Sequence, residues 1–215
     1  MNFWKKLEFK LINEKKVISF LVSGSGLNFS IIAKKIQKNE IPAIIGTVVT
    51  DNEGAGVILR SKSFGIKSYF IDPEIHKPVE TFDKQIITIF ERYHTDLVVT
   101  AGYLRLLSPL FIDRYRNRII NVHPSLLPSF PGMRSQKRAL EFGSKITGCT
   151  THFVNEGIDT GPIILQSPVS IFENDTVSSL SQRILKEEFK ILPETIKLFC
   201  ENRLRVIGGK VLIDY

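Results

Sequence analysis

Short apolar runs alternate with amphipathic helical patterns through the first half of this 215-residue chain. The apolar runs lie at residues 16–22, 43–50, 68–71 and 97–101. The helical patterns between them lie at residues 29–36, 55–63 and 81–93. Continuous apolar strands separated by helices are typical of parallel sheets that are buried on both faces. The sequence therefore predicts an α/β fold in which helices flank a mostly parallel twisted sheet.

The second half of the chain has a different pattern. Residues 147–155 and 162–171 read as two strands joined by a wide loop, which predicts an antiparallel hairpin. Residues 176–202 form a long helical stretch, in which Pro193 is expected to cause a kink. The tail, residues 203–215, reads as a second short hairpin. An antiparallel C-terminal portion is therefore expected beside the parallel sheet.

Residues 119–123 form one more apolar strand, and the loop that follows it is rigid. That loop holds Pro124, Pro128 and Pro131. Proline fixes φ, so the loop can keep one shape at little entropic cost. Side chains alternate along a strand, which places Asn121 and His123 on the same face. We expect a site there, because parallel sheets bind ligands at the carboxyl ends of their strands. A core histidine with one structural hydrogen bond is the alternative interpretation of His123.

The first strand ends in a glycine turn, Ser23–Gly26, that leads into a helix with Asn28 as its expected N-cap. A dinucleotide fingerprint would need a third glycine at Phe29, so that motif is broken. A glycine turn at a helix N-terminus still suits a phosphate group. The turn is therefore either a phosphate site or a purely structural element.

Two acidic residues and one further histidine bear on the same chemistry. Asp159 lies between the two strands of the predicted hairpin, as either a turn residue or the partner of His123. Glu188 falls on the apolar stripe of the long helix, where a carboxylate needs a partner. It can be an ion-paired core residue or an acceptor for ligand hydroxyls. His152, inside a strand, is expected to be structural although near the site.

Composition limits the classes of function. The net charge of +7 favours anionic partners, but the basic residues are scattered without the helix or aromatic strand of a nucleic-acid-binding protein. No apolar stretch reaches the roughly 20 residues that span a bilayer, and the N-terminus lacks the apolar core of a signal peptide. Cys149 and Cys200 lack metal-ligand spacing. We therefore expect a cytoplasmic protein with a small anionic substrate, without disulfide, metal, nucleic acid or membrane.

Three motifs in sequence order carry a family resemblance that covers nearly the whole chain from Lys16. Residues 121–128 read NVHPSLLP, residues 102–109 read GYLRLLSP, and residues 159–164 read DTGPII. They resemble the core signature, the folate-loop segment and the catalytic aspartate loop of the folate-dependent formyltransferases, most closely the branch that serves purine biosynthesis. The resemblance implies a Rossmann-like formyltransferase fold.

The resemblance also implies a reaction and its residues. A formyl group would pass from 10-formyltetrahydrofolate to the primary amine of glycinamide ribonucleotide. Asn121 would stabilise the oxyanion, His123 would act as general acid and base, and Asp159 would raise the imidazole pKa and keep the ring charged. Besides Asn121 and Asp159, folate would contact Leu104, Arg105, Leu106, Leu107, Asn155, Glu156, Gly157 and Ile158. The ribonucleotide would contact Gly26, Leu27, Asn28 and Glu188.

The same resemblance suggests how the chain is organised. Residues 1–15 would be an N-terminal extension and residues 16–215 a single domain. Within that domain, residues 16–115 would form a phosphate-binding half and residues 116–215 a folate-binding and catalytic half. With five lysines and two acids through Lys16, the extension is expected to be solvated. The assembly is expected to be a monomer or a homodimer.

Departures from the family pattern concern substrate binding, and they leave rival functions open. Leu27 stands where the family usually has serine, Phe189 and Leu192 replace histidine and tyrosine, and Val79 aligns with an arginine. The rivals are a 10-formyltetrahydrofolate hydrolase and a noncatalytic relative that binds folate or phosphate. The hydrolase normally has an N-terminal regulatory domain, and the related methionyl-tRNA formyltransferase has a second C-terminal domain. Neither is expected in a chain of this length.

Overall fold

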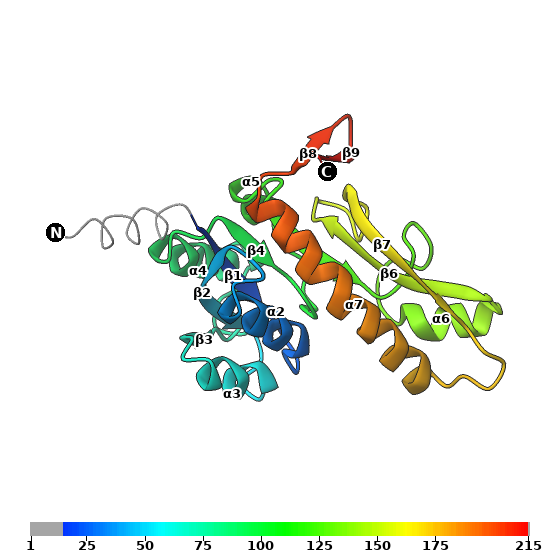
Figure 1. Cartoon of the computed structure of the whole chain (residues 1–215). Coiled ribbons are helices and arrows are strands. Elements are labelled where there is room, and N and C mark those ends of the chain that lie inside the picture. The colour runs from blue at the N-terminus through cyan, green and yellow to red at the C-terminus, as the bar shows by residue number, and fades with distance from the viewer. Residues whose placement is uncertain (1–14, 215) are drawn as a thin grey trace.

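The computed structural model describes residues 15–214, and a seven-stranded sheet runs through it (Figure 1). The strand order is β3-β2-β1-β4-β5-β6-β7. The strands are β1 (Lys16–Leu21), β2 (Ala43–Thr50), β3 (Ser68–Phe70), β4 (Leu97–Val99), β5 (Ile119–His123), β6 (Ile146–Phe153) and β7 (Ile163–Ser170). Strands β1 to β5 pair in parallel, whereas β6 runs antiparallel to both β5 and β7. The predicted mostly parallel sheet and the β6–β7 hairpin are both confirmed.

Helices cover both faces of this sheet. They are α2 (Leu27–Gln37), α3 (Gly56–Ser63), α4 (Val79–Arg92), α5 (Pro109–Arg114), α6 (Ser135–Phe142) and α7 (Val177–Cys200). Alternate residues of β4 explain the two layers, because Leu97 and Val99 belong to one core cluster and Val98 to the other. Burial on both faces of the sheet therefore explains why the sequences of these strands are nearly continuous apolar runs.

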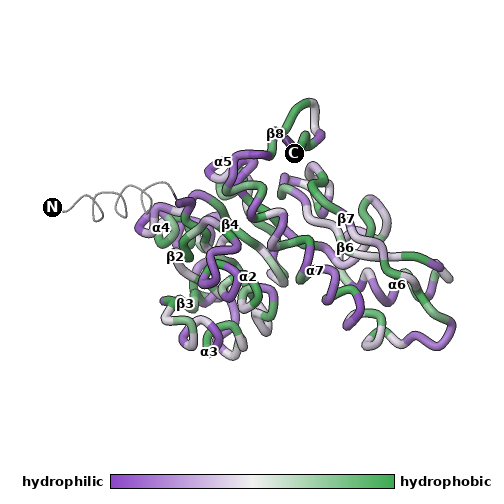
Figure 2. The backbone as a smooth tube through the Cα atoms, in the orientation of Figure 1, coloured by the Kyte–Doolittle hydropathy of each residue, from purple (hydrophilic) through white to green (hydrophobic). Residues whose placement is uncertain are grey.

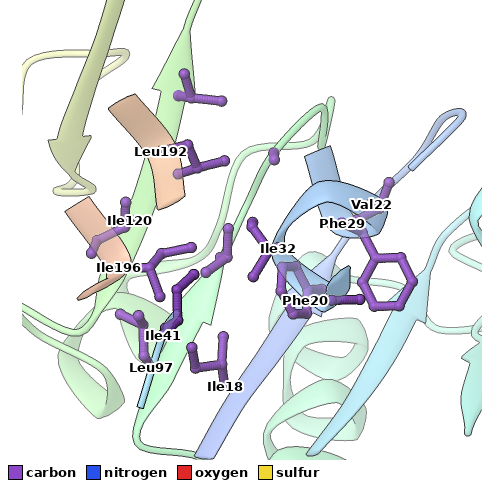
Figure 3. Packing of buried hydrophobic residues seen from close by; sticks show 14 of the residues in the cluster. Ile18, Phe20, Val22, Phe29, Ile32, Ile41, Leu97, Ile120, Leu192 and Ile196 are labelled. Carbon is purple, nitrogen blue, oxygen red and sulfur yellow. The ribbon is translucent and has the colours of Figure 1, made fainter. Parts of the chain in front are cut away.

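The two core clusters draw on different helices. The first receives Phe29 and Ile32 from α2 and Leu192 and Ile196 from α7 (Figure 3). The second receives Phe82, Ile86 and Phe90 from α4, and Phe111 and Ile112 from α5. Figure 2 shows both hydrophobic and hydrophilic residues along α7, which fits a helix that packs one side against the sheet. Pro193 lies inside α7, which continues past it to Cys200.

The strand order reverses direction between β1 and β4. Sequence neighbours β1, β2 and β3 extend to one side, and β4 to β7 extend to the other. At such a switch point the loops after the two central strands separate and leave a crevice at the carboxyl ends of the strands. The glycine turn after β1 and the segment from Gly102 after β4 both lie at this edge.

The C-terminal tail forms the expected hairpin, a separate two-stranded antiparallel sheet. Its strands are β8 (Leu204–Ile207) and β9 (Lys210–Ile213). Gly208 and Gly209 between them have φ of 57° and 76°, in the left-handed region that glycine adopts at little cost.

Two helices and one helix cap differ from the sequence prediction. Helices α5 and α6, of six and eight residues, were not predicted, because α5 is too short to show a clear apolar period and α6 buries only Ser135 and Ala139. The cap of α2 is Gly26 rather than Asn28, which already lies in the first turn. The Asn28 side chain does not cap the helix. It donates a hydrogen bond to the Glu188 carboxylate.

Candidate active site

The pairing of β5 with β6 brings together the polar side chains at the carboxyl end of β5. Asn121 lies opposite His152, and His123 lies opposite Thr150. Ile120 and Val122, which alternate with Asn121 and His123, belong to the core cluster under α2 and α7. Asn121 and His123 therefore share the other face of the sheet, as the alternation of the strand predicted.

Asp159 contacts both of these side chains from the loop between β6 and β7. Its Oδ2 lies 3.1 Å from Nδ1 of His123, and its Oδ1 lies 3.5 Å from Nδ2 of Asn121. The backbone N–H of Gly132 donates to Oδ2 at 2.7 Å and ties the carboxylate to the proline-rich loop. The expected meeting of Asp159 with His123 is confirmed, and the imidazole and carboxylate are only 7% and 14% exposed.

The protonation of His123 differs from the sequence prediction. Burial lowers the pKa of His123 below its ordinary value of 6.5, and the Asp159 carboxylate and the Phe130 carbonyl only partly offset that effect. The prediction that Asp159 keeps the ring charged was therefore wrong in its net direction, although the carboxylate does raise the pKa. The sequence showed the partner of the histidine but not how deeply the pair is buried.

Both ring nitrogens of His123 face oxygen acceptors. Nε2 lies 3.0 Å from the carbonyl oxygen of Phe130, and Nδ1 faces Asp159. A neutral imidazole carries one N–H and can donate to only one of these oxygens. When the ring gains a proton, it donates to both. The site is thus arranged to receive a proton that it does not hold at neutral pH.

Asp159 stays ionised in this setting. Burial by itself would raise the pKa of Asp159, but the hydrogen bond with His152, the Gly132 N–H and the attraction to the His123 ring when it is protonated together lower it below its usual value. A buried anion held by these groups stabilises a positive charge on a neighbouring imidazole. Asp159 can therefore serve as the fixed counter-ion for a transient imidazolium.

His152 belongs to the site, although the sequence placed it only nearby. Its Nε2 lies 3.2 Å from Nδ2 of Asn121 and 3.5 Å from Oδ1 of Asp159, and its Nδ1 lies 2.9 Å from the carbonyl oxygen of Phe153. With its proton on Nε2 the ring donates to Asp159, and with its proton on Nδ1 it donates to Phe153 and accepts from Asn121. The Thr100 hydroxyl donates to Oδ1 of Asn121 at 3.3 Å, so both ends of the amide are oriented. Only the β5–β6 register reveals this contact.

A polar clamp holds the loop that carries the Phe130 carbonyl. The Thr150 hydroxyl donates to the carbonyl of Ser125 at 2.7 Å and accepts the N–H of Leu127 at 3.0 Å. Gln166 donates to the Leu127 carbonyl at 2.8 Å and to the Thr150 hydroxyl at 3.0 Å. These bonds supplement the prolines, and they anchor the loop to the neighbouring strands β6 and β7.

The glycine turn after β1 presents the N-terminus of α2. Gly26 has φ of 74°, and a Cβ at this position would lie 2.6 Å from the Val57 side chain. Only glycine fits this left-handed, crowded position. The first N–H groups of α2, beginning at Leu27, have no intrahelical acceptor and suit an anion.

Glu188 faces this helix end from α7. Nδ2 of Asn28 donates to Oε2 of Glu188 at 2.8 Å. Burial raises the pKa of Glu188, and the hydrogen bond from Asn28 opposes that shift. The partner that the sequence pattern required for this carboxylate is therefore Asn28. Of the departures from the family pattern, Leu192 is fully buried in the core and Val79 lies at the start of α4.

The segment after β4 is tied to the glycine turn. The N–H of Ser23 donates to the Gly102 carbonyl at 3.1 Å, and the Ser23 hydroxyl accepts the N–H of Leu104 at 3.1 Å. Leu104 and Leu106 are 70% and 68% exposed, which leaves an apolar surface at the edge of the site. The Arg105 guanidinium lies over the Phe82 ring, 5.4 Å from its centre.

The loop between β6 and β7 has a similar mixed character. Ile158 is 54% exposed, while the Asn155 side chain accepts from the Gly157 N–H at 3.2 Å and orders the turn. Glu156 forms an exposed ion pair with Arg116 at 2.7 Å, so its carboxylate points to a surface partner. Apart from Asn121 in β5, the predicted folate-contact residues thus lie in two loops, and the Asp159 end of one loop joins the β5 residues.

Beneath the segment after β4 lies a buried polar cluster that the sequence did not indicate. The N–H of Ser108 donates to Oδ2 of Asp83 at 2.6 Å, and burial raises the pKa of Asp83. Burial also raises the pKa of Tyr103, whose hydroxyl has no hydrogen-bond partner among the described residues. The Asp83 contact anchors the start of α5, directly after the exposed leucines.

Within residues 15–214, no group of three or more His, Cys, Asp or Glu side chains is arranged to hold a metal ion. None of the helices in the same range combines the length and hydrophobicity that crossing a bilayer requires.

Comparisons with known proteins agree on one family. The family model described as formyl transferase matches residues 15–196. A phosphoribosylglycinamide formyltransferase from Bacillus subtilis is 38% identical over 182 residues, which are 85% of this chain and 93% of that protein. The crystal structure of glycinamide ribonucleotide transformylase 1 from Symbiobacterium toebii superimposes with a TM-score of 0.91 at 42% identity, and the match covers 93% of this chain and 94% of that one.

A more distant structure shares the fold alone. It is a formyltetrahydrofolate deformylase from Pseudomonas syringae, with a TM-score of 0.87 and 24% identity. The match covers 94% of this chain but 66% of that protein.

Proposed function

The chain belongs to the formyl transferase family, among its phosphoribosylglycinamide formyltransferases, and on that premise we propose how it acts. It transfers the formyl group of 10-formyltetrahydrofolate to the primary amine of glycinamide ribonucleotide, and it thereby makes formylglycinamide ribonucleotide for purine biosynthesis. One observation carries this proposal. An amide, an imidazole and a carboxylate meet at the carboxyl end of β5, with Asp159 3.1 Å from His123 and 3.5 Å from Asn121.

The reaction needs a charge stabilised and a proton moved. When the amine nitrogen bonds to the formyl carbon, negative charge develops on the formyl oxygen. An amide N–H donor in a protected site stabilises such an oxyanion, and Asn121 supplies the donor. The amine must lose a proton, and the folate nitrogen must gain one as its bond to the formyl carbon breaks. The net transfer is balanced without any other reactant.

His123 suits the proton transfer because it is neutral before the reaction. Its lowered pKa leaves it able to accept the amine proton at neutral pH. The charged ring then donates to both Asp159 and the Phe130 carbonyl, which already lie in place. The Asp159 carboxylate is more exposed than the His123 ring. We therefore propose that a water molecule beside this carboxylate transfers the proton between His123 and the reactants.

The two ligands fit the two edges of the site. The exposed Leu104 and Leu106 and the half-exposed Ile158 offer apolar surface to a flat pteridine, and the backbone groups of the same loops offer hydrogen bonds. The N-terminus of α2 suits the phosphate of the ribonucleotide, and Glu188 suits its ribose hydroxyls. Leu27 lacks the hydroxyl of the serine that is usual in the family, but its backbone N–H remains. The phosphate is therefore bound by the backbone N–H groups and the dipole of the helix.

The decisive experiment follows loss of the formyl group from 10-formyltetrahydrofolate with and without glycinamide ribonucleotide. We expect turnover that requires the ribonucleotide and yields one formylated product for each folate consumed. His123→Ala and Asp159→Asn are each expected to lower kcat by about 10²–10⁴-fold. Turnover without the ribonucleotide would instead support the hydrolase, and folate binding without turnover would support the noncatalytic relative.

The organisation inferred from the sequence remains part of the proposal. We assign residues 16–115 to phosphate binding and residues 116–215 to folate binding and catalysis, within one domain. We also place the enzyme in the cytoplasm, as a monomer or a homodimer.

A further inference from the structure

The segment that joins β4 to α5 has two different sides. Leu104 and Leu106 are exposed, whereas Tyr103 and Leu107 pack against the second core cluster, to which α4 contributes. Residues 102–107 belong to neither a helix nor a strand. The shape of the segment therefore depends on its contacts with neighbouring elements.

Two hydrogen bonds hold the ends of this segment. The N–H of Leu104 donates to the Ser23 hydroxyl at 3.1 Å, and the N–H of Ser108 donates to Oδ2 of Asp83 at 2.6 Å. The backbone groups of residues 105–107 form no hydrogen bond with any other residue that the structure describes. The path of these residues is therefore set from the two ends and by the side chains that face α4.

Asp83 on α4 faces several residues of the segment at once. Burial raises the pKa of Asp83, and the contacts with Ser108 and the charge of Arg105 oppose that rise. Burial also raises the pKa of Tyr103, as do the charges of Asp51 and Asp83. These effects require the Arg105 guanidinium and the Tyr103 hydroxyl to lie near the Asp83 carboxylate.

Stability alone does not explain an acid at position 83. The residue is fully buried, and its Oδ1 has no hydrogen-bond partner among residues 15–214. A buried carboxylate with an unpaired oxygen is costly to maintain. An apolar side chain would pack against the second core cluster without that cost, but it would leave the Ser108 N–H without an acceptor.

We propose that Asp83 is a positioning residue for folate binding. Through the N–H of Ser108 it holds residues 104–107 in the shape that turns Leu104 and Leu106 toward the pteridine. The inference rests on the proposed function, in which this segment contacts 10-formyltetrahydrofolate. Asp83 acts through the segment and does not touch the folate, so it should affect folate binding more than ribonucleotide binding or the chemical step.

The test measures binding of 5-formyltetrahydrofolate, an isomer that does not donate its formyl group, by calorimetry, together with the KM for both substrates. Asp83→Ala should weaken folate binding and raise the folate KM by about tenfold or more, because the Ser108 N–H loses its acceptor. The KM for the ribonucleotide and kcat should each change by less than about threefold. Asp83→Asn retains an oxygen acceptor and should stay within about threefold of the wild type in folate affinity.

Two further variants separate positioning from general loss of stability. Thr95→Val is the matched control, because it removes a buried hydrogen bond, between the Thr95 and Ser19 hydroxyls at 2.7 Å, before the first residue of β4 rather than after its last. It should lower stability without changing folate affinity. Asp83→Leu keeps the branch at Cγ and favours the helix, so it removes the acceptor even if Asp83→Ala fails to fold. Circular dichroism and urea unfolding check folding and stability in each case.

The outcomes distinguish this inference from the function on which it rests. A selective loss of folate affinity in Asp83→Ala or Asp83→Leu, with affinity restored in Asp83→Asn, supports the proposal. Wild-type folate affinity in Asp83→Leu, an equal loss in Thr95→Val, or no recovery in Asp83→Asn would overturn it while the proposed function stands. A wild-type protein that binds no folate would overturn both.

Discussion

Oδ2 of Asp159 lies 3.1 Å from Nδ1 of His123 and accepts the backbone N–H of Gly132 at 2.7 Å. One carboxylate oxygen thus joins the histidine at the end of β5 to the proline-rich loop that follows it. The orientation of the imidazole and the position of the loop depend on the same group. Four expectations about this site follow from its contacts.

Asp159→Asn should lower the pKa of His123 still further. Burial already lowers this pKa, and the charge of Asp159 is the largest of the effects that oppose it. Removal of the charge leaves burial less opposed, so the shift away from 6.5 should grow. NMR titration of the imidazole in the ligand-free protein measures this directly. Glu141→Gln, an exposed carboxylate on α6, is the control and should leave the His123 titration in place. An increase in the His123 pKa in Asp159→Asn would contradict the electrostatic role of Asp159.

The free energy of unfolding should fall as the pH drops below about 6.5, in part because of His123. Its folded pKa is below the ordinary value of 6.5, so in this range the unfolded chain binds the proton more readily. The contribution of His123 to the free energy of unfolding therefore rises with pH between its folded pKa and 6.5, and it is constant above 6.5. Urea unfolding at several pH values between 5 and 8 measures the free energy of unfolding at each. We expect this free energy to rise less steeply with pH in His123→Asn than in the wild type. Equal slopes would mean that His123 titrates alike in the folded and unfolded chain.

Gly26→Ala should impair the phosphate site, whereas Gly24→Ala should not. The added Cβ at position 26 would lie 2.6 Å from the Val57 side chain and 2.9 Å from its backbone, at a positive φ, while nothing lies within 4 Å of a Cβ at position 24. We expect Gly26→Ala to cost about 1–3 kcal/mol of stability and to raise the KM for the ribonucleotide more than it lowers kcat. Denaturant unfolding and steady-state kinetics measure the two effects. Similar kinetics for the two variants would argue against phosphate binding at this turn.

Thr150→Val should loosen the loop that carries the Phe130 carbonyl. The substitution keeps the shape of the side chain but removes the hydroxyl that bonds Ser125, Leu127 and Gln166. Buried groups left without partners should lower the free energy of unfolding by about 1–3 kcal/mol. Thr88→Val on the exposed side of α4 is the control, with an expected change below about 0.5 kcal/mol. Because His123 depends on that carbonyl, kcat should also fall in Thr150→Val alone.

Much of the fold was predictable because local patterns and tertiary burial agree. The strands 43–50 and 119–123 have the predicted bounds. Val48 and Val49 of the first strand enter the two core clusters, and Ile120 and Ile119 of the second strand do the same. The short helix α5 was missed, although Ser108 caps it and Pro109 follows at its first position. Six residues contain too few turns for a hydrophobic period, so only the capping signal was present.

The residues of the candidate site that lie on one strand were predictable, but the contacts between residues of different strands were not. Asn121 and His123 follow from alternation within β5. The place of His152 depends on which residue of β6 lies opposite Asn121, and the sequence does not contain this register in any local pattern. The direction of the His123 pKa required the depth of burial, and the contact of its Nε2 required the path of the loop to Phe130.

The register of β5 has a consequence for which changes of length the chain can accept. Ile120 and Val122 enter the core on one face of this strand, and Asn121 and His123 form the site on the other. An inserted or deleted residue that slides the strand by one position would exchange the two sets. It would bury the amide and the imidazole and expose two aliphatic side chains in the crevice. We therefore expect insertions and deletions within β5 to impair both folding and catalysis, because the same strand supplies residues to the core and to the site.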